Sequence, residues 1–296
     1  MYILFFMQLI ESIPNFSEGT DESIVEKILS DFRQSDVNLV DYTYDSDYNR
    51  LVVTIIGEPE KVKAGLLKAS DTAIKTIDMR KHRGAHPRMG AVDVVPFVPL
   101  KEITMEECVE LSKKFAQELS QKYNLPVFLY DESASSLERI DIDYLRKGEF
   151  EGLKEHMKEV KPDFGPDTPH VTAGATITGA REVMVGLNVN LSTSDLKIAK
   201  KIAKAVHAKT GGLSYVKAMA CEYKGMTQIG MSNINFKKTP VYRQVELIKM
   251  EASRYGVQVV SSEFCGLVPL KALIDVCTYY LKVEDLDEKS IIEMNI

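Results

Sequence analysis

Hydrophobic spacing divides the first half of the chain into six predicted elements. Apolar residues at helical spacing predict a helix over residues 21–32, with Thr20 as its N-cap. A second predicted helix covers residues 59–77 and begins with proline, which suits the free N–H groups of a helix start. Runs rich in β-branched and aromatic residues predict strands over residues 8–14, 37–44, 51–56 and 91–100. The order is therefore β-α-β-β-α-β.

The second half of the chain repeats this order. Strands are predicted over residues 182–191 and 257–262, and a hairpin around Lys224 and Gly225 joins the strands 213–221 and 227–236. One helix is predicted over residues 195–209, after Thr193 or Ser194, and another from Pro240 to about Arg254. Such a repeat indicates one supersecondary unit used twice.

The segment between the two halves contains a helix, a short strand and a loop-rich stretch. A capping box, Thr104-x-x-Glu107, opens the helix, "PVFLY" is the short strand, and residues 149–179 are predicted to be rich in loops. The pattern predicts an α+β protein of two ferredoxin-like (β-α-β-β-α-β) subdomains in tandem, over residues 7–179 and 180–296, with a ligand cleft between them. An unrelated α/β sandwich is the alternative fold.

Composition and charge narrow the class of protein. The chain has 296 residues, of which 45% are apolar and 27% charged, as in ordinary globular proteins. A formal net charge of −6 argues against nucleic-acid binding. No apolar run approaches the ~18 residues of a membrane span, and the apolar start, "MYILFF", is too short for a signal peptide, so that Met7 is a second candidate start. Four widely spaced cysteines suit a reducing cytoplasm.

One segment concentrates positive charge in this acidic chain. Residues 79–90, "MRKHRGAHPRMG", hold four cations, Arg80, Lys81, Arg83 and Arg88, beside His82 and His86 and no acid. Proline after His86 favours an extended backbone there, and the flanking glycines are expected to leave room around the imidazole. A histidine of near-neutral pKa beside an arginine fork suits proton transfer on an anionic substrate. The alternative is a solvated basic loop without a ligand.

Other motifs are weaker candidates. His82 and His86 have the spacing of a zinc pair, but Gly84 and Pro87 break any helix and the cations repel a metal, so no metal is expected. The glycine- and threonine-rich segment 162–181 is either a binding loop or a plain linker. Polar residues at strand ends line a site or serve as caps and turns; they are Asn15, Ser17, Glu18 and Asp41.

Several quoted stretches resemble the formiminotransferase family. They are "IPNFSEG", "NR" at 49–50, "IDMRKHRGAHPRMGAVDVVPFVP", "PDFGP", "GATITGAR", "LNVNL" and "GLVPLKALID". The resemblance spans about residues 8–290. The chain resembles the stand-alone form of the family, which has no cyclodeaminase domain, so a separate cyclodeaminase is expected. The resemblance implies a homodimer, folate held between two subdomains, and transfer of the formimino group of N-formimino-L-glutamate to N5 of tetrahydrofolate, a co-substrate, in histidine degradation.

The resemblance also implies site residues. His86 is the expected catalytic acid and base, with His82 and Asp41 as further catalytic candidates; the family's second carboxylate after Asp41 is missing, and Asp45 is a possible replacement. Arg83, Arg88, Asn15 and Arg50 are the expected substrate-binding residues. The expected folate-binding segment is Gly165, Pro166, Asp167, Thr168, Pro169, His170, Val171, Thr172, Ala173 and Gly174. Two alternative functions remain: formyl transfer between N-formylglutamate or 5-formyltetrahydrofolate and the complementary acceptor, and folate binding without catalysis.

Overall fold

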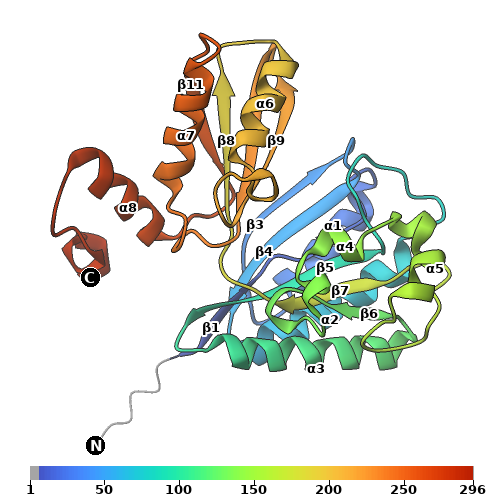
Figure 1. Ribbon diagram of the computed structural model, residues 1–296. Helices are drawn as coiled ribbons and strands as arrows, with labels where there is room; N and C mark the ends of the chain where they lie inside the picture. Colours follow the sequence, from blue (N-terminus) through green and yellow to red (C-terminus); the bar gives the residue numbers. More distant parts are fainter. Residues whose placement is uncertain (1–6, 296) are drawn as a thin grey trace, which may run out of the picture. The chain divides into compact units, whose positions relative to one another are not determined.

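The computed structural model describes residues 7–295 and confirms the α+β class. Contacts within the chain divide it into two compact units, one ending at Arg181 and the other beginning at Glu182 (Figure 1). Each unit has its own sheet and its own hydrophobic core. The predictions for the first six residues lie outside the described residues.

Unit 1 contains the predicted β-α-β-β-α-β order with additions. Strand β1 pairs antiparallel with β4 and β5, and β3 pairs with β4. The four strands of the predicted order, β1, β3, β4 and β5, therefore form one sheet. Strand β7 runs parallel to β5 and β6 and extends this sheet. The elements are β1 (Leu9–Ser12), β2 (Asn15–Phe16), α1 (Glu22–Arg33), β3 (Asn38–Asp45), β4 (Arg50–Gly57), α2 (Pro59–Thr76), β5 (Val92–Lys101), α3 (Met105–Tyr123), β6 (Val127–Leu129), α4 (Ile142–Leu145), α5 (Glu149–Glu159) and β7 (Thr176–Ala180).

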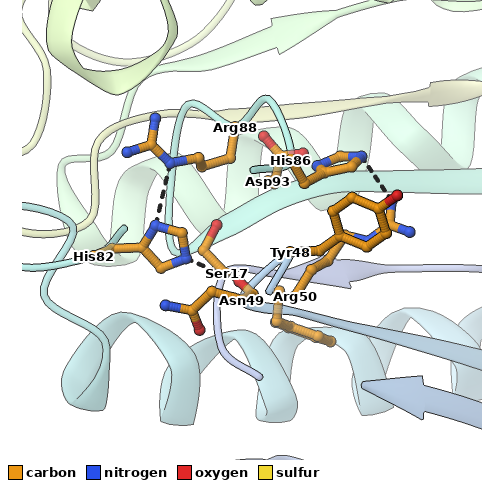
Figure 2. Close-up of a pocket in the computed structure, with 9 residues that line it drawn as sticks. Ser17, Tyr48, Asn49, Arg50, His82, His86, Arg88 and Asp93 are labelled. Carbon is orange, nitrogen blue, oxygen red and sulfur yellow. Dashed lines mark hydrogen bonds between the residues drawn. The ribbon is translucent and has the colours of Figure 1, made fainter. Parts of the chain in front are cut away.

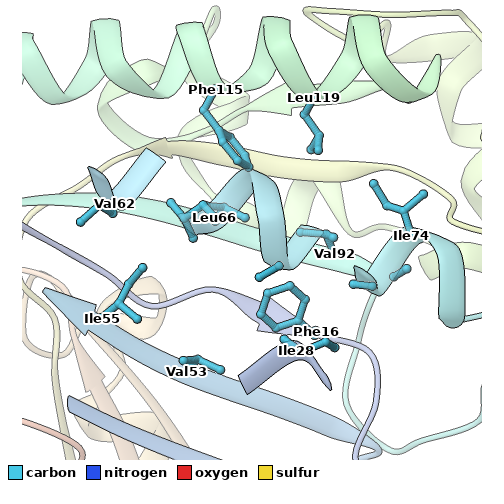
Figure 3. Packing of buried hydrophobic residues seen from close by; sticks show 14 of the residues in the cluster. Phe16, Ile28, Val53, Ile55, Val62, Leu66, Ile74, Val92, Phe115 and Leu119 are labelled. Atoms are coloured by element: carbon cyan, nitrogen blue, oxygen red, sulfur yellow. The ribbon is translucent and has the colours of Figure 1, made fainter. Parts of the chain in front are cut away.

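Helices cover the sheet of unit 1 on both faces. Helices α1, α2 and α3 share the larger core with the strands, where Phe16 and Phe115 are fully buried (Figure 3). Helices α4 and α5 pack in a second cluster with Phe128 and Ile177. Successive side chains of a strand point to opposite faces, and Val94 belongs to this second cluster while Val95 belongs to the larger core. The α4–α5 segment therefore lies on the face opposite α1–α3.

The structure corrects two details of unit 1. The N-cap of α1 is Asp21, not Thr20, because the Asp21 carboxylate accepts hydrogen bonds from the N–H groups of Ser23 and Ile24. The stretch 149–179 also holds more regular structure than predicted, namely α5 and β7. Only three buried residues mark α5 and glycine interrupts it, so its helical periodicity is weak in the sequence.

Unit 2 repeats the order in an antiparallel sheet of four strands, arranged β11-β8-β10-β9. The predicted hairpin is confirmed: Lys224 and Gly225 connect β9 to β10, and both have positive φ, 48° and 78°, as a two-residue hairpin turn requires. Helix α8 was not predicted. The elements are β8 (Val185–Leu191), α6 (Leu196–Val206), β9 (Val216–Tyr223), β10 (Met226–Asn233), α7 (Val241–Ser253), β11 (Val259–Cys265) and α8 (Leu270–Leu281).

The capping box of α3 gives a first stability prediction. The Thr104 hydroxyl accepts the Glu107 N–H at 3.2 Å, and the Glu107 carboxylate accepts the Thr104 N–H at 2.7 Å, as the sequence predicted. We expect Thr104→Ala to lower the free energy of unfolding by about 1 kcal/mol, because one N–H group of the helix start loses its acceptor. Urea unfolding followed by circular dichroism measures this, with Thr104→Ser as the matched control that keeps the hydroxyl. Equal stability of the two variants would contradict the prediction.

Candidate functional site

The basic segment between α2 and β5 is a loop held against the β3–β4 turn. The Ala85 N–H donates to the Asp47 carbonyl at 3.0 Å, and the Asn49 side-chain amide donates to the Arg83 carbonyl at 2.8 Å. Asn49 is itself buried, with 8% of its surface exposed. A loop fixed at several points along its length presents its side chains from defined positions. This fixation argues against the solvated basic loop that the sequence left open.

The glycines of the loop do not leave room around the imidazole, contrary to the prediction. A Cβ on Gly84 would lie 2.3 Å from the Tyr48 carbonyl oxygen, and one on Gly90 would lie 2.0 Å from the Ala175 carbonyl oxygen. Both glycines are therefore needed where two backbone segments approach closely. They position the loop and line no open space.

His86 stands half-buried beside an arginine that the turn supplies. The Arg50 guanidinium, at the first residue of β4, lies 2.6 Å from His86 Nε2 (Figure 2). Because a guanidinium only donates, Nε2 is the acceptor and the imidazole is neutral. Burial, followed by the Arg50 and Arg146 charges, lowers the pKa of His86 to about 4. The Tyr48 ring meets the imidazole edge-on, with centroids 6.4 Å apart.

Asp93 is the carboxylate at this site, and sequence reasoning missed it. Asn15 pairs with Val94 and the next residue, Phe16, pairs with Val92, so Asp93 is an extra residue in β5, a bulge. The bulge turns this side chain out of the strand alternation, and Asp93 lines the same pocket as His86. A signal existed in the sequence: an acid interrupts the otherwise apolar run "AVDVVPF".

Two hydrogen bonds fix Asp93, which is only 2% exposed. One oxygen accepts the Met89 N–H at 2.9 Å, and the other pairs with the guanidinium of Arg146. Arg146 lies between α4 and α5, and its Nε is buried with no hydrogen-bond partner among the described residues. The negative charge of Asp93 partly offsets the effect of the arginines by raising the pKa of His86.

His82 is a structural residue in this geometry. Its Nε2 lies 2.8 Å from the Asn49 carbonyl oxygen, so this nitrogen donates, and its Nδ1 accepts the Arg88 Nε–H at 3.1 Å. Burial lowers the pKa of His82. Both ring nitrogens are therefore engaged in a neutral imidazole, and the arrangement leaves no free nitrogen for proton transfer. The predicted second catalytic role is not supported by this position.

Arg88 is paired with acidic side chains of α5. Its guanidinium donates to Glu149 at 2.7 Å and to both carboxylate oxygens of Glu151, at 2.8 and 2.7 Å. These hydrogen bonds raise the pKa of Arg88, and the pair with Glu151 has the largest effect. Arg88 is 5% exposed. The segment contains no acid, but α5 supplies two. In this arrangement Arg88 anchors α5 to the loop and holds His82, and the substrate-steering role expected for it stays a prediction.

The remaining catalytic and substrate-binding candidates lie in different places. Arg83 is exposed, and its guanidinium donates to the carbonyl groups of Arg80 and His82. Asp41 pairs in β3 with Thr54, four positions along β4 from Arg50, or about 13 Å at ~3.3 Å per residue. The structure thus does not bring Asp41 to His86.

Two smaller placements complete this set. Asp45 accepts the N–H groups of Asp47 and Tyr48 and so shapes the β3–β4 turn. Asn15 lies closer to the imidazole, with its Oδ1 3.5 Å from Arg50 Nη1. Among the predicted substrate-binding residues, Arg50 and Asn15 are therefore the pair that the structure brings to His86.

The expected folate-binding segment, residues 165–174, packs partly against the basic loop. The Thr172 carbonyl accepts the Met79 N–H at 2.8 Å, and the Ala173 carbonyl accepts the Ala91 N–H at 3.0 Å. The N–H groups of Thr172 and Ala173 turn inward to His170 Nδ1. The first half packs elsewhere, since a Cβ on Gly165 would lie 2.5 Å from the Leu125 carbonyl oxygen.

The pocket around His86 is small and polar. Its space of about 180 Å³ is in part open to solvent, and it is lined by Phe16, Ser17, Tyr48, Asn49, Arg50, His82, His86, Arg88 and Asp93 (Figure 2). Within residues 7–295, no three His, Cys, Asp or Glu side chains gather as a metal site would require. In the same part of the chain, every helix is too short or too polar to cross a membrane.

Comparisons with known proteins agree with the resemblance seen in the sequence. Residues 9–181 match the model of the formiminotransferase domain, N-terminal subdomain, and residues 186–296 match that of the formiminotransferase domain. A glutamate formimidoyltransferase of Streptococcus pyogenes is 44% identical, with 98% of this chain and 99% of the relative covered. One from Thermoplasma acidophilum is 45% identical over 97% of both chains.

The bifunctional relatives match over a shorter part of their length. The formimidoyltransferase-cyclodeaminase of Rattus norvegicus is 39% identical over 94% of this chain but only 53% of its own. The two domain models together leave few residues of this chain unmatched, and they meet where the structure divides into its two units. This chain belongs to the formiminotransferase family.

Proposed function

We propose that this chain is a one-carbon transferase that moves the formimino group of N-formimino-L-glutamate to N5 of tetrahydrofolate. Near full-length identity of 44–45% to two glutamate formimidoyltransferases supports this activity. The observation in this chain that carries it is the neutral His86, held half-buried between Arg50 and Asp93. A half-buried neutral imidazole has one ring-nitrogen lone pair that can take up a proton, as a proton transfer between two nitrogens needs.

The chemistry assigns His86 two successive tasks. Transfer forms a bond between N5 of tetrahydrofolate and the amidine carbon and breaks the bond from that carbon to the glutamate nitrogen. His86 Nε2 takes the proton that the attacking amine loses, and the resulting imidazolium returns a proton to the departing glutamate nitrogen. General acid–base catalysis of this kind accelerates a reaction by roughly 10²–10⁴-fold. Asp93 stabilises the imidazolium, because it is the carboxylate that raises the pKa of His86.

The proposal keeps the predicted folate position next to His86. The segment 170–174 lies beside the two ends of the basic loop and the Tyr48 ring is 48% exposed next to His86, so a pterin ring has a wall and a flat partner there. The contacts of residues 165–169 to tetrahydrofolate and a ligand cleft between two ferredoxin-like subdomains stay predictions. The homodimer also stays a prediction, which analytical ultracentrifugation of the purified chain tests.

The assay for the function compares donors and acceptors directly. Acid treatment of the reaction converts the expected product to 5,10-methenyltetrahydrofolate, which absorbance detects. We expect this signal with N-formimino-L-glutamate and tetrahydrofolate together and with neither alone. A higher kcat/KM with N-formyl-L-glutamate would support the formyl-transfer alternative. Tight folate binding without product from either donor would indicate a binding protein and contradict the proposal.

A further inference from the structure

Within residues 7–295, Arg50 differs from Arg80, Arg88 and Arg146 in having no acidic partner. Arg88 pairs with two glutamates and Arg146 with Asp93, and the exposed Arg80 pairs with Asp78. Within the described part of the chain, no carboxylate lies within ion-pair distance of the Arg50 guanidinium, whose hydrogen-bond contacts are His86 Nε2 and the Asn15 amide oxygen. Burial and then the Arg146 charge lower the pKa of Arg50. The charges of Asp93 and Asp45 offset this only from a distance. A largely buried guanidinium without a directly paired carboxylate is a costly arrangement that a bound anion relieves.

The contact between Arg50 and His86 also restrains the proposed base. A neutral imidazole has one ring nitrogen that can accept a proton. In His86 this nitrogen is Nε2, and the Arg50 guanidinium donates a hydrogen bond to it. While this hydrogen bond lasts, Nε2 cannot accept a proton from a substrate. The described arrangement is therefore a resting state, and the base works only after the guanidinium finds another acceptor.

We propose that Arg50 binds a carboxylate of the amino-acid substrate, and that this binding draws the guanidinium away from Nε2 and so switches His86 on. The inference rests on the proposed function, because it names the carboxylate class that the same site takes. A guanidinium holds a carboxylate through two parallel hydrogen bonds, which are stronger than one to a neutral ring nitrogen. The guanidinium carbon also lies 5.8 Å from the centroid of the Tyr48 ring, which is 48% exposed, and we propose that a rotation of the Arg50 side chain makes the exchange.

The charges that face His86 decide the sign of the effect. Arg50 from β4 and Arg146 from the α4–α5 connection disfavour the imidazolium, and Asp93 from β5 favours it. A bound carboxylate adds a negative charge and removes the Arg50 contact, so both changes raise the pKa of His86. An opposite charge within ~4–6 Å shifts a pKa by about 1–3 units. By linkage, protonation of His86 strengthens carboxylate binding by the same factor, about tenfold for each unit.

The test is a histidine NMR titration of the whole chain labelled with ¹³C and ¹⁵N at histidine. Glutarate is the probe, since it carries the two carboxylates of glutamate and no reacting group. The chain has five histidines, and the resonance missing in His86→Gln identifies His86. We expect saturating glutarate to raise the pKa of His86 by at least about one unit. Where acid unfolding shortens the titration, the Nε2 chemical shift at pH 6 reports the loss of the Arg50 hydrogen bond.

Two variants separate the proposed switch from general charge effects. Arg50→Gln is expected to raise the pKa of His86 in the free protein and to abolish the further shift with glutarate. Arg80→Gln is the matched control. It removes an exposed arginine of the loop that carries His86, where Arg80 is paired with Asp78, and this variant should behave like the natural chain. A glutarate shift that persists in Arg50→Gln, or one absent from the natural chain, overturns the inference.

The outcome is independent of the proposed function. A chain that transfers the formimino group without a glutarate-dependent shift of His86 keeps the function and loses the switch. A chain that shows the shift but makes no 5,10-methenyltetrahydrofolate keeps the carboxylate site and loses the assigned reaction. The two failures therefore give different pairs of results.

Discussion

His86→Ala is expected to lower kcat for formimino transfer by about 10²–10⁴-fold while the chain remains folded, because the reaction loses its proton acceptor and donor. The side chain is half-buried, and its contacts are to Arg50 and Tyr48 rather than to the hydrophobic core. The absorbance assay for 5,10-methenyltetrahydrofolate measures the loss, and circular dichroism checks the fold. His207→Asn is the matched control, since His207 caps a turn of unit 2 through Nδ1 and asparagine keeps an acceptor there. Near-natural turnover of a folded His86→Ala chain would remove His86 from the mechanism.

The pH dependence of the natural enzyme carries a second signature of the same residue. A base must be unprotonated, so activity falls as the pH drops through its pKa. The value of about 4 for His86 applies to the form without a bound carboxylate. With folate saturating, kcat/KM for N-formimino-L-glutamate reports the enzyme without this substrate, so it should fall as the pH drops through about 4. The value of kcat reports the enzyme with bound substrate, so it should begin to fall at a higher pH. Coincident acidic limbs would show that substrate binding leaves His86 unchanged.

The sequence predicted most of the fold because local and long-range signals agree there. Helix α2 begins at its proline, α3 at its capping box, and the β9–β10 hairpin turns at Lys224 and Gly225. Helix α5 and strand β7 were missed because tertiary contacts determine them: α5 buries only Leu153, His156 and Met157, and β7 is a five-residue strand between two parallel neighbours. The periodicity of so few residues cannot distinguish a helix from a loop.

The sequence offered a reactive group for the site but not its charge partners. A histidine before proline in a basic segment made His86 a candidate beside the alternative of a solvated loop, and the family resemblance gave it the predicted catalytic role. The pairing of Arg88 with Glu149 and Glu151 joins residues 61 and 63 positions apart, and no local pattern predicts which cation a distant acid will neutralise. Arg50 was among the expected substrate-binding residues. The sequence could not show that it lacks an acidic partner within residues 7–295, because this depends on where the fold puts every neighbouring charge.

Asp41 and Asp93 show why a carboxylate is hard to assign from spacing alone. Asp41 was a catalytic candidate because the resemblance implies it, but it lies in the middle of β3 and pairs with Thr54, away from His86. Asp93 stands inside a strand, where alternation predicts a side chain buried in a core. A one-residue bulge changes that direction, and bulges leave little trace in a single sequence.

Asp93→Asn is expected to lower the free energy of unfolding by about 3–5 kcal/mol, because it leaves the guanidinium of Arg146 buried without its counter-charge. The two side chains are 3% and 12% exposed, so water cannot replace the lost partner. The amide keeps an oxygen for the Met89 N–H, which confines the change to the charge. Urea unfolding measures the loss, and the same variant should lower the pKa of His86 further, since Asp93 raises it.

A second substitution separates the lost charge pair from simple damage to the strand. If the cost of Asp93→Asn is the uncompensated charge of Arg146, then Arg146→Met in that background removes the charge and restores much of the stability, because apolar replacement of a buried ion pair is often neutral. The coupling energy between the two positions should therefore be large and favour the pair. A double variant no more stable than Asp93→Asn alone would place the effect in the bulge of β5 instead, and Asp93 would then act on His86 through the position of the strand rather than through its charge.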